Sequence, residues 1–142
     1  MFLGAFNHSL DDKNRITLPA KYRSRLAAGI VMTAGRDRFL VVYPKDEFEL
    51  LAAQVGKLSV TAREAATLRR LVFGNGSDLT PDKLGRVVVP ESLKEHAGIT
   101  TDVVIVGTGN FMELWNPEEW KRAQEEVQNH AALDSAWANL GV

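Results

Sequence analysis

Residues 11–23 read DDKNRITLPAKYR, and residues 81–94 read PDKLGRVVVPESLK. Each stretch contains an acid and a Lys, a turn-forming residue, an Arg, three strand-like residues and a Pro. An offset of 71 residues superimposes the two copies and pairs Asp11 with Asp82, Arg15 with Arg86 and Pro19 with Pro90. A short chain that repeats so ordered a pattern is expected to contain a duplicated structural unit.

The repeat extends well beyond this motif. After one small insertion the offset becomes 72 residues, and it pairs Gly35 with Gly107, Phe39 with Phe111, Tyr43 with Trp115 and Phe48 with Trp120. Chance could repeat one pentapeptide, but it does not account for the whole order. We therefore interpret the chain as two copies of one module.

Both copies predict the same succession of local structures. Residues 15–19 and 86–90 are short β-rich runs, and the Pro that ends each run suits the first position of a helix. These helices are expected to end at Gly29 and Gly98, because a left-handed cap fits there. A β-hairpin and a second helix follow in each copy, with hairpins expected over 31–43 and 103–115 and helices over 44–55 and 116–127.

The predicted fold class is α+β, built from tandem duplicated β-hairpin and helix modules. Its four segments are module 1 (5–50), a connecting helical segment (51–76), module 2 (77–122) and a C-terminal helical tail (123–142). In the connecting helix, Thr61 and Glu64 are expected to form a capping box. In the tail, Trp137 and Leu140 are expected either to pack within the protein or to face a neighbouring subunit.

The residue before each motif Arg is suited to a tight turn. Asn14 and Gly85 occupy matching positions, and both residue types tolerate a left-handed backbone. Each Arg would then leave the turn at the base of a strand, held ready to grip a phosphate or a guanine edge. The alternative is that Arg15 and Arg86 pair with Asp11 and Asp82 and brace the turns.

The two copies differ in the residues around the motif. In 15–19 the residues alternate, so Arg15 and Thr17 are expected on a solvent-exposed face, whereas 86–90 is apolar on both faces and is expected to be covered. The first copy adds Lys13, Lys21, Arg23 and Arg25; the second offers chiefly Lys83 and Lys94 amid Glu91 and Glu95. We therefore predict that the first copy contacts phosphates and bases and that the second mainly braces the structure.

The bulk composition limits the possible functions. The chain has 142 residues and no Cys, which excludes disulfides and thiol catalysis. Neither a signal peptide nor an apolar run of about 18 residues is found, so we expect a soluble, cytoplasmic protein. The net charge is −1, but residues 1–75 carry 12 Lys and Arg against 7 Asp and Glu, whereas 76–142 carry 5 against 11. Such asymmetry is typical either of a half that binds a polyanion or of a dipolar surface without a partner.

The repeated motif, with MFLGAF at the start, resembles the MraZ family over nearly the whole chain, from MFLG through NPEEW. The matching residues are Asp11, Lys13 and Arg15 in the first motif and Asp82, Gly85 and Arg86 in the second. Asn14 departs from the family's usual Gly, and Leu84 departs from its usual polar or basic residue. The resemblance implies two SpoVT/AbrB-like modules of the swapped-hairpin type, whose intertwined hairpins close small β-barrels with flanking helices.

The resemblance also implies a function. MraZ-like proteins are DNA-binding transcriptional regulators that assemble into rings and bind short direct repeats upstream of the division and cell wall gene cluster. The expected partners are double-stranded DNA and further copies of the chain, at the nucleoid, with no cofactor, metal, membrane or small-molecule substrate. The residues expected to contact DNA are Arg15, Lys13, Asn14, Thr17, Lys21 and Arg86.

Two other classes of function are alternatives to DNA binding. For an enzyme, the three His residues at 8, 96 and 130 lack ligand spacing, and the paired acids fit turns and helix starts. The stretch GTGNF lacks the further glycine of a dinucleotide loop and leads into a strand, so we expect no enzymatic activity. The other class is a protein-binding or antitoxin-like module of the same fold without its own operator, which fold alone does not exclude.

Overall fold

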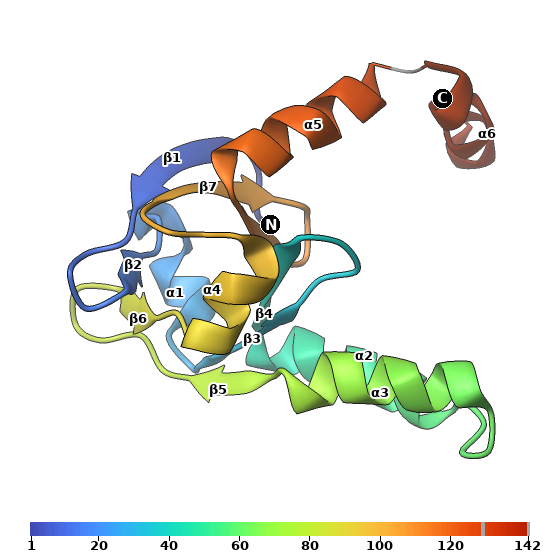
Figure 1. The fold of residues 1–142 in the computed structure, drawn as a ribbon, viewed down its shortest axis with the longest axis horizontal. Coiled ribbons are helices and arrows are strands. Elements are labelled where there is room, and N and C mark those ends of the chain that lie inside the picture. Colours follow the sequence, from blue (N-terminus) through green and yellow to red (C-terminus); the bar gives the residue numbers. More distant parts are fainter. Residues whose placement is uncertain (129, 142) are drawn as a thin grey trace.

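The computed structural model describes residues 1–128 and 130–141. Pairs of strands alternate with helical segments along the chain, as Figure 1 shows. The elements are β1 (Ala5–Ser9), β2 (Arg15–Thr17), the 3₁₀ turn η1 (Ala20–Tyr22), α1 (Arg23–Leu26), β3 (Ile30–Ala34), β4 (Phe39–Pro44), α2 (Lys45–Gly56), α3 (Arg63–Gly74), β5 (Ser77–Leu79), β6 (Arg86–Val88), α4 (Glu91–Ala97), β7 (Asp102–Gly107), β8 (Met112–Trp115), α5 (Pro117–Val127) and α6 (His130–Leu140). The fold class is α+β, as predicted.

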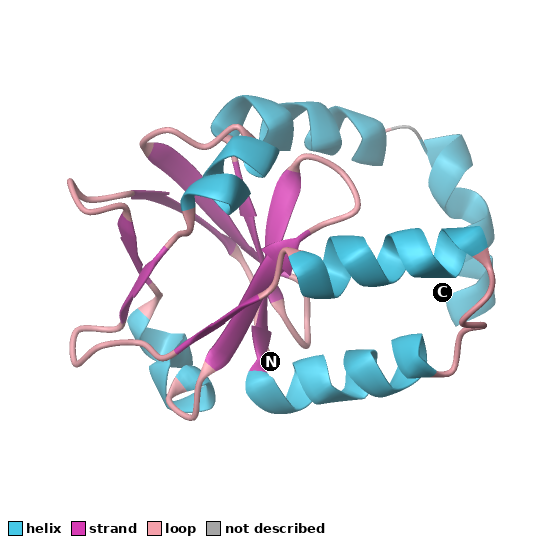
Figure 2. Cartoon of the chain, turned by 60° about the horizontal axis from the view of Figure 1, so that its bottom comes forward, coloured by secondary structure: helices cyan, strands magenta, loops and turns pink. Residues whose placement is uncertain are grey.

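The strands form an antiparallel sheet and a separate ribbon (Figure 2). The six-stranded sheet has the order β1-β7-β8-β4-β3-β5, and the two-stranded ribbon pairs β2 with β6. The predicted hairpins are confirmed, because β3 pairs with β4 and β7 with β8. The remaining pairings cross between the two halves of the chain: β1 lies against β7, β4 against β8, β5 against β3, and β2 against β6.

Backbone hydrogen bonds between the two halves of the chain continue past the ends of the ribbon. The amide of Val89 donates to the carbonyl of Asn14 at 2.9 Å, and the amide of Leu18 donates to the carbonyl of Gly85 at 2.8 Å. These two bonds are equivalent under the 71-residue offset. Each copy of the motif is therefore completed by the other copy, in one chain.

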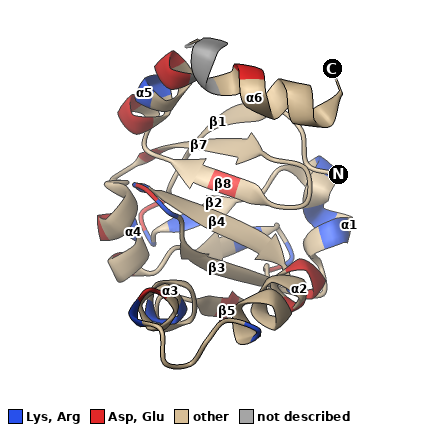
Figure 3. Ribbon diagram, turned by 90° about the vertical axis from the view of Figure 1, so that its right-hand side faces the viewer, with Lys and Arg blue, Asp and Glu red and all other residues tan. Residues whose placement is uncertain are grey.

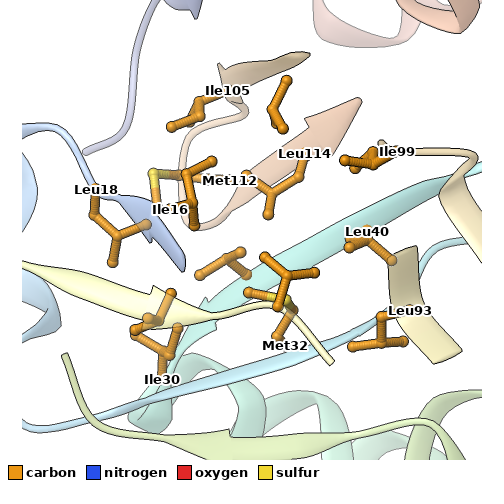
Figure 4. Packing of buried hydrophobic residues seen from close by; sticks show 14 of the residues in the cluster. Ile16, Leu18, Ile30, Met32, Leu40, Leu93, Ile99, Ile105, Met112 and Leu114 are labelled. Carbon is orange, nitrogen blue, oxygen red and sulfur yellow. The ribbon is translucent and has the colours of Figure 1, made fainter. Parts of the chain in front are cut away.

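The core lies between the inner face of the ribbon and the six-stranded sheet (Figure 4). The ribbon and the residues that follow it contribute Ile16, Leu18, Val87 and Val89, and the sheet contributes Ile30, Met32, Leu40, Ile105, Met112 and Leu114. Each of these side chains is at most 3% exposed. Burying one such side chain stabilises the fold by about 1.5–3 kcal/mol, so the ribbon is anchored from below by its alternate residues.

The longer helices lie on the other side of the sheet from the ribbon and flank its central strands, with α2 and α3 beside β3 and α5 beside β7 (Figure 1 and Figure 3). Equivalent aromatic pairs fix the two helices that follow the hairpins: Tyr43 lies 5.7 Å from Phe48 at α2, and Trp115 lies 5.6 Å from Trp120 at α5, between ring centroids. Thr33 of β3 donates to the carbonyl of Val72 at 2.6 Å and ties α3 to the sheet. This leaves the ribbon with its two turns at the opposite end of the molecule.

Several local predictions need correction. Ala62, in extended backbone, is the N-cap of α3 and no side chain caps it, so the capping box of Thr61 and Glu64 is wrong. The left-handed cap at Gly98 is confirmed with φ 65°, but α1 already ends at Leu26, before Gly29. Pro19 and Pro90 are the N-caps of η1 and α4, not the first helical residues that the sequence predicted. Strands β1 and β5 were not predicted, because neither run is apolar enough to signal a strand without the cross-pairing that the duplication provides.

Candidate nucleic-acid interface

The first motif forms a tight turn braced by its own acid. The Oδ1 atom of Asp11 accepts hydrogen bonds from the backbone amides of Lys13 and Arg15, both at 2.9 Å. Its Oδ2 atom accepts a bond from Nε of Arg15 at 2.7 Å. Asn14 has φ 58°, the left-handed conformation predicted for this position. One carboxylate thus fixes both the turn and the Arg that leaves it.

The second motif repeats this geometry. The Oδ1 atom of Asp82 accepts from the amides of Leu84 at 3.0 Å and Arg86 at 2.8 Å, and its Oδ2 atom accepts from Nε of Arg86 at 2.7 Å. Gly85 has φ 77°, as predicted. The two turns are therefore built in the same way, although one contains Asn and the other Gly.

The hydrogen bonds in both turns favour the ionised carboxylate. The backbone hydrogen bond from Arg15 is the largest effect that lowers the pKa of Asp11, and the side-chain bond from Arg15 lowers it further. The pKa of Asp82 is lowered in the same way, first by the backbone of Arg86 and then by its side chain. Both acids consequently remain charged at neutral pH and keep the two Arg side chains in place.

Bracing does not use up the Arg side chains. In the described part of the chain, the hydrogen bonds and ion pairs of both guanidinium groups use only Nε. A guanidinium carries further N–H donors on its two terminal nitrogens, in a planar fork that matches a phosphate or a guanine edge. The two roles that the sequence posed as alternatives for Arg15 and Arg86 are thus compatible in one geometry.

The ribbon register brings both Arg residues to one face. Arg15 lies opposite Val88, and Thr17 lies opposite Arg86. Because directly opposed residues share a face, these four side chains point away from the core, opposite to Ile16 and its partner in β6. The two Arg residues are diagonal neighbours across the strands, a relation that corresponds to about 7–8 Å. We call the outward side of β2 and β6, with the turns Asp11–Asn14 and Asp82–Gly85, the ribbon face.

The strand of the second motif has one exposed face, contrary to the prediction. Val88 is 49% exposed, so the expectation that residues 86–90 are shielded on both faces is wrong. The reason is the ribbon pairing, which turns Val88 outward beside Arg15. The Arg15 and Arg86 side chains are 25% and 29% exposed. The two Arg side chains are therefore similarly exposed, which gives no reason to assign contact with a nucleic acid to the first copy alone.

Basic residues cross between the copies. Lys94 of α4 donates from Nζ to Oδ1 of Asn14 at 2.8 Å, so a base of the second half supports the first turn. Its counterpart under the 71-residue offset is Arg23, which lies against the second turn: a Cβ placed on Gly85 would be 2.5 Å from Nε of Arg23. From the sequence, each basic residue was expected to act in its own copy, because composition does not indicate which strands pair across the two copies.

The remaining bases predicted in the first copy are dispersed. Lys13 is exposed in its turn. The Nζ atom of Lys21 lies 4.6 Å from the ring centroid of Phe6 and makes a cation–π contact. Arg25 forms an ion pair with Asp46 of α2 at 3.0 Å. The structure thus brings Lys13, Asn14, Arg15, Thr17 and Arg86 together at the ribbon face, with Lys21 beside β1.

Metal sites and membrane spans are two further kinds of feature that a chain of this size could contain. Within residues 1–128 and 130–141, no three His, Asp or Glu side chains are grouped so that they could hold a metal ion. Over the same residues, no helix combines the length and the apolar character that a bilayer-spanning segment requires.

Comparison with known proteins gives a consistent result. The family described as "MraZ protein, putative antitoxin-like" matches this chain twice, over residues 1–71 and 72–138. The chain is 41% identical to the transcriptional regulator MraZ of Herpetosiphon aurantiacus over 92% of both chains, and 40% identical to that of Syntrophomonas wolfei over 91% of this chain and 90% of the relative. It is 35% identical to that of Clostridium acetobutylicum over the full length of both. The chain therefore belongs to the MraZ family.

Proposed function

We propose that this protein is a transcriptional regulator, without enzymatic activity, that binds double-stranded DNA through the ribbon face. The observation that carries the proposal is the placement of Arg15 and Arg86 on one outward surface, each braced through Nε and each with its terminal N–H donors available. A two-stranded β-ribbon fits the major groove of B-DNA, where Arg is the side chain best suited to a guanine edge. The relatives named as transcriptional regulators support the same function.

The residues of the ribbon face have different roles in this proposal. Arg15 and Arg86 contact base edges or the nearest phosphates, because their orientation is fixed before binding. Lys13 contacts phosphate from its exposed turn, and Thr17 donates or accepts beside Arg86. Asn14 presents its amide at the turn, where the family's usual residue has no side chain. Lys21 contacts phosphate by leaving the Phe6 ring.

The finer architecture belongs to the same proposal. The modules 5–50 and 77–122, joined by 51–76 and followed by the tail 123–142, exchange their hairpins as SpoVT/AbrB-like barrels do. Several chains form a ring on short direct repeats in the promoter of the division and cell wall gene cluster, at the nucleoid. One ribbon face makes few phosphate contacts, so the affinity for one repeat is low at physiological salt, and a ring gains affinity through several linked contacts.

The test is fluorescence anisotropy with labelled duplexes that carry one, two or three repeats or scrambled repeats. We expect Arg15→Ala and Arg86→Ala each to weaken binding to the specific repeat by about 1–3 kcal/mol and to reduce sequence preference. Lys13→Ala should weaken binding to all duplexes alike and lower the salt dependence. Arg25→Ala is the matched control, because its partner Asp46 lies at α2.

Three outcomes distinguish the alternatives. If only Arg15→Ala loses sequence preference, the first copy alone reads DNA, as the sequence predicted. If a single repeat binds as tightly as three, multivalent binding is wrong. If the folded wild-type chain shows no salt-sensitive binding to DNA from upstream of its own gene, the regulator function is overturned in favour of the protein-binding or antitoxin-like alternative.

A further inference from the structure

An apolar pocket opens on the sheet face that points away from the ribbon. It has a volume of about 340 Å³ and lies between the sheet and helices α2 and α3. Its apolar lining includes Phe39, Val41, Tyr43, Leu68, Leu71 and Phe111. Leu68 is 40% exposed, so the pocket wall formed by α3 is only partly covered within the chain. This pocket has the size and the character of a site that receives apolar side chains.

The pocket contains one carboxylate. Glu113 of β8 lines it and accepts a hydrogen bond from Nε1 of Trp115 at 2.9 Å. Burial raises the pKa of Glu113, and burial together with the charge of Glu113 raises the pKa of Tyr43. A carboxylate that is short of water in an apolar site favours an incoming N–H donor. The complementary partner is therefore apolar and carries a donor.

The tail helix of the same chain has these properties. In α6, Leu133, Trp137 and Leu140 follow the spacing i, i+4, i+7 and therefore lie on one face of the helix. Trp137 is 52% exposed and Leu140 is 73% exposed. An exposed Trp on an apolar helical stripe is typical of a binding anchor, and its indole carries one N–H donor.

The charges around the two surfaces are complementary. The loop and helix over 57–71 carry Lys57, Arg63, Arg69 and Arg70 against Glu64, a net charge of +3. Residues 117–141 in α5 and α6 have five acids against two bases, a net charge of −3. Figure 3 shows α5 beside one edge of the sheet and α3 beside the other, with β8 and β4 between them. Opposite charges steer such surfaces together and set their orientation.

We propose that the Leu133–Trp137–Leu140 stripe of α6 in one copy docks into the β4–β8–α3 pocket of a second copy, with the Trp137 indole N–H donating to Glu113. This inference rests on the ring proposed above and assigns its contact surfaces. Trp137 and Leu140 of the stripe and Leu68 of the pocket wall are exposed in one chain, so the contact is not made within that chain. Because the two surfaces differ, the contact is head-to-tail, and such contacts close into a ring when the rotation permits.

The experiment uses full-length variants and measures mass by sedimentation velocity over a concentration series. Trp137→Ala removes the anchor and should weaken self-association by about 30-fold or more per contact. Leu68→Arg blocks the pocket and should have the same effect. Leu3→Ala is the control, since Leu3 is 60% exposed near the N-terminus and belongs to neither surface. Should Leu68→Arg fail to fold by circular dichroism, Leu68→Ala replaces it, with a smaller expected loss.

Mixing the two variants gives the decisive result. The Trp137→Ala chain retains its pocket and the Leu68→Arg chain retains its stripe, so together they should form a complex of two chains, twice 15.7 kDa, that cannot grow further. Wild-type masses for both variants would overturn the docking contact but leave ring assembly intact. If both variants have reduced mass but form no complex on mixing, the contact is symmetric. If the wild-type protein is a monomer at every concentration, the stripe docks within its own chain. Either result overturns the proposal. Binding of one DNA repeat, measured in parallel, reports on the ribbon face independently.

Discussion

The hydrogen bond between Lys94 and Asn14 provides a sharp test of how the two halves are joined. The Lys94 side chain is only 13% exposed, and its Nζ donates to Oδ1 of Asn14 at 2.8 Å; its next partner, Glu91, is 3.8 Å away. Hydrogen bonds to charged groups contribute about 1.5–3 kcal/mol. We therefore expect Asn14→Gly to lower the free energy of unfolding by about that amount, even though Gly suits the left-handed backbone better.

A double-mutant cycle isolates this interaction. Asn14→Gly, Lys94→Met and the double variant are unfolded in urea at one pH, and the coupling free energy is taken from the four stabilities. We expect a coupling of about 1.5–3 kcal/mol, because both residues contribute to one bond across 80 positions of sequence. Substitutions at independent sites add to within about 0.3–0.5 kcal/mol, so a coupling free energy no larger than this would show that the bond is not formed.

The duplication supplies an internal control. Arg23 is the counterpart of Lys94, but the residue that it covers is Gly85, which has no side chain to accept a hydrogen bond. Arg23 is also exposed. We expect Arg23→Met to change stability by less than about 0.5 kcal/mol, as is usual for an exposed substitution. Equal losses for Arg23→Met and Lys94→Met would mean that charge near the turns stabilises the fold, and the specific bond would be refuted.

Three further predictions concern other residues. The folded-state pKa values of Asp11 and Asp82 lie below the ordinary value of 3.8. The two ionised carboxylates therefore stabilise the fold fully above pH 3.8, and this stabilisation is lost as the pH falls through the lowered pKa values. Asp11→Asn should make the free energy of unfolding, measured in urea titrations from about pH 5 to about pH 2, fall less steeply with pH. The pKa of Glu113 is raised above its ordinary value of 4.5, so the protonated side chain stabilises the fold fully below pH 4.5, and this stabilisation is lost as the pH rises. Glu113→Gln should therefore raise the melting temperature at neutral pH but not at about pH 3. A lower melting temperature of this variant at neutral pH would contradict the prediction. Gly85→Ala should destabilise by about 1–2 kcal/mol because its φ is 77°, whereas Gly85→Asn should cost less, since Asn14 adopts the same conformation; equal costs in thermal melts would count against this account.

The sequence predicted the local structure well because the local signals are strong. Pro19 and Pro90 mark the ends of the ribbon strands, and the left-handed positions Asn14 and Gly85 are fixed by residue type. The pairings β1 with β7 and β5 with β3 could not be read from periodicity, because a short strand does not encode which edge it joins. The resemblance to an intertwined family indicated exchange, but not its register.

The structure brings most of the predicted site residues together, but in an arrangement that the sequence did not predict, and their contact with DNA stays a prediction. The motif identified Arg15 and Arg86, and the structure places both on one face. Surface charge was assigned by position in the sequence, which put Arg23 in the first copy although it lies at the second turn. Val88 was expected to be covered because an apolar run predicts burial on both faces, yet the two-stranded ribbon has only one buried face. Composition determines how apolar a strand is, but pairing determines which side is covered.

Exchange within one chain has a physical consequence for recognition. If two separate chains each supplied one strand of the ribbon, dilution would separate β2 from β6 and abolish the face that carries Arg15 and Arg86. Here the link between the copies is covalent, so the effective concentration of each half for the other does not depend on protein concentration. The ribbon face therefore remains assembled in the monomer. In the proposed ring, the assembly of several chains would set only how many such faces meet DNA at once. Loss of the tail contact should then reduce binding to tandem repeats while binding to one repeat is unchanged, which separates reading from avidity within one protein.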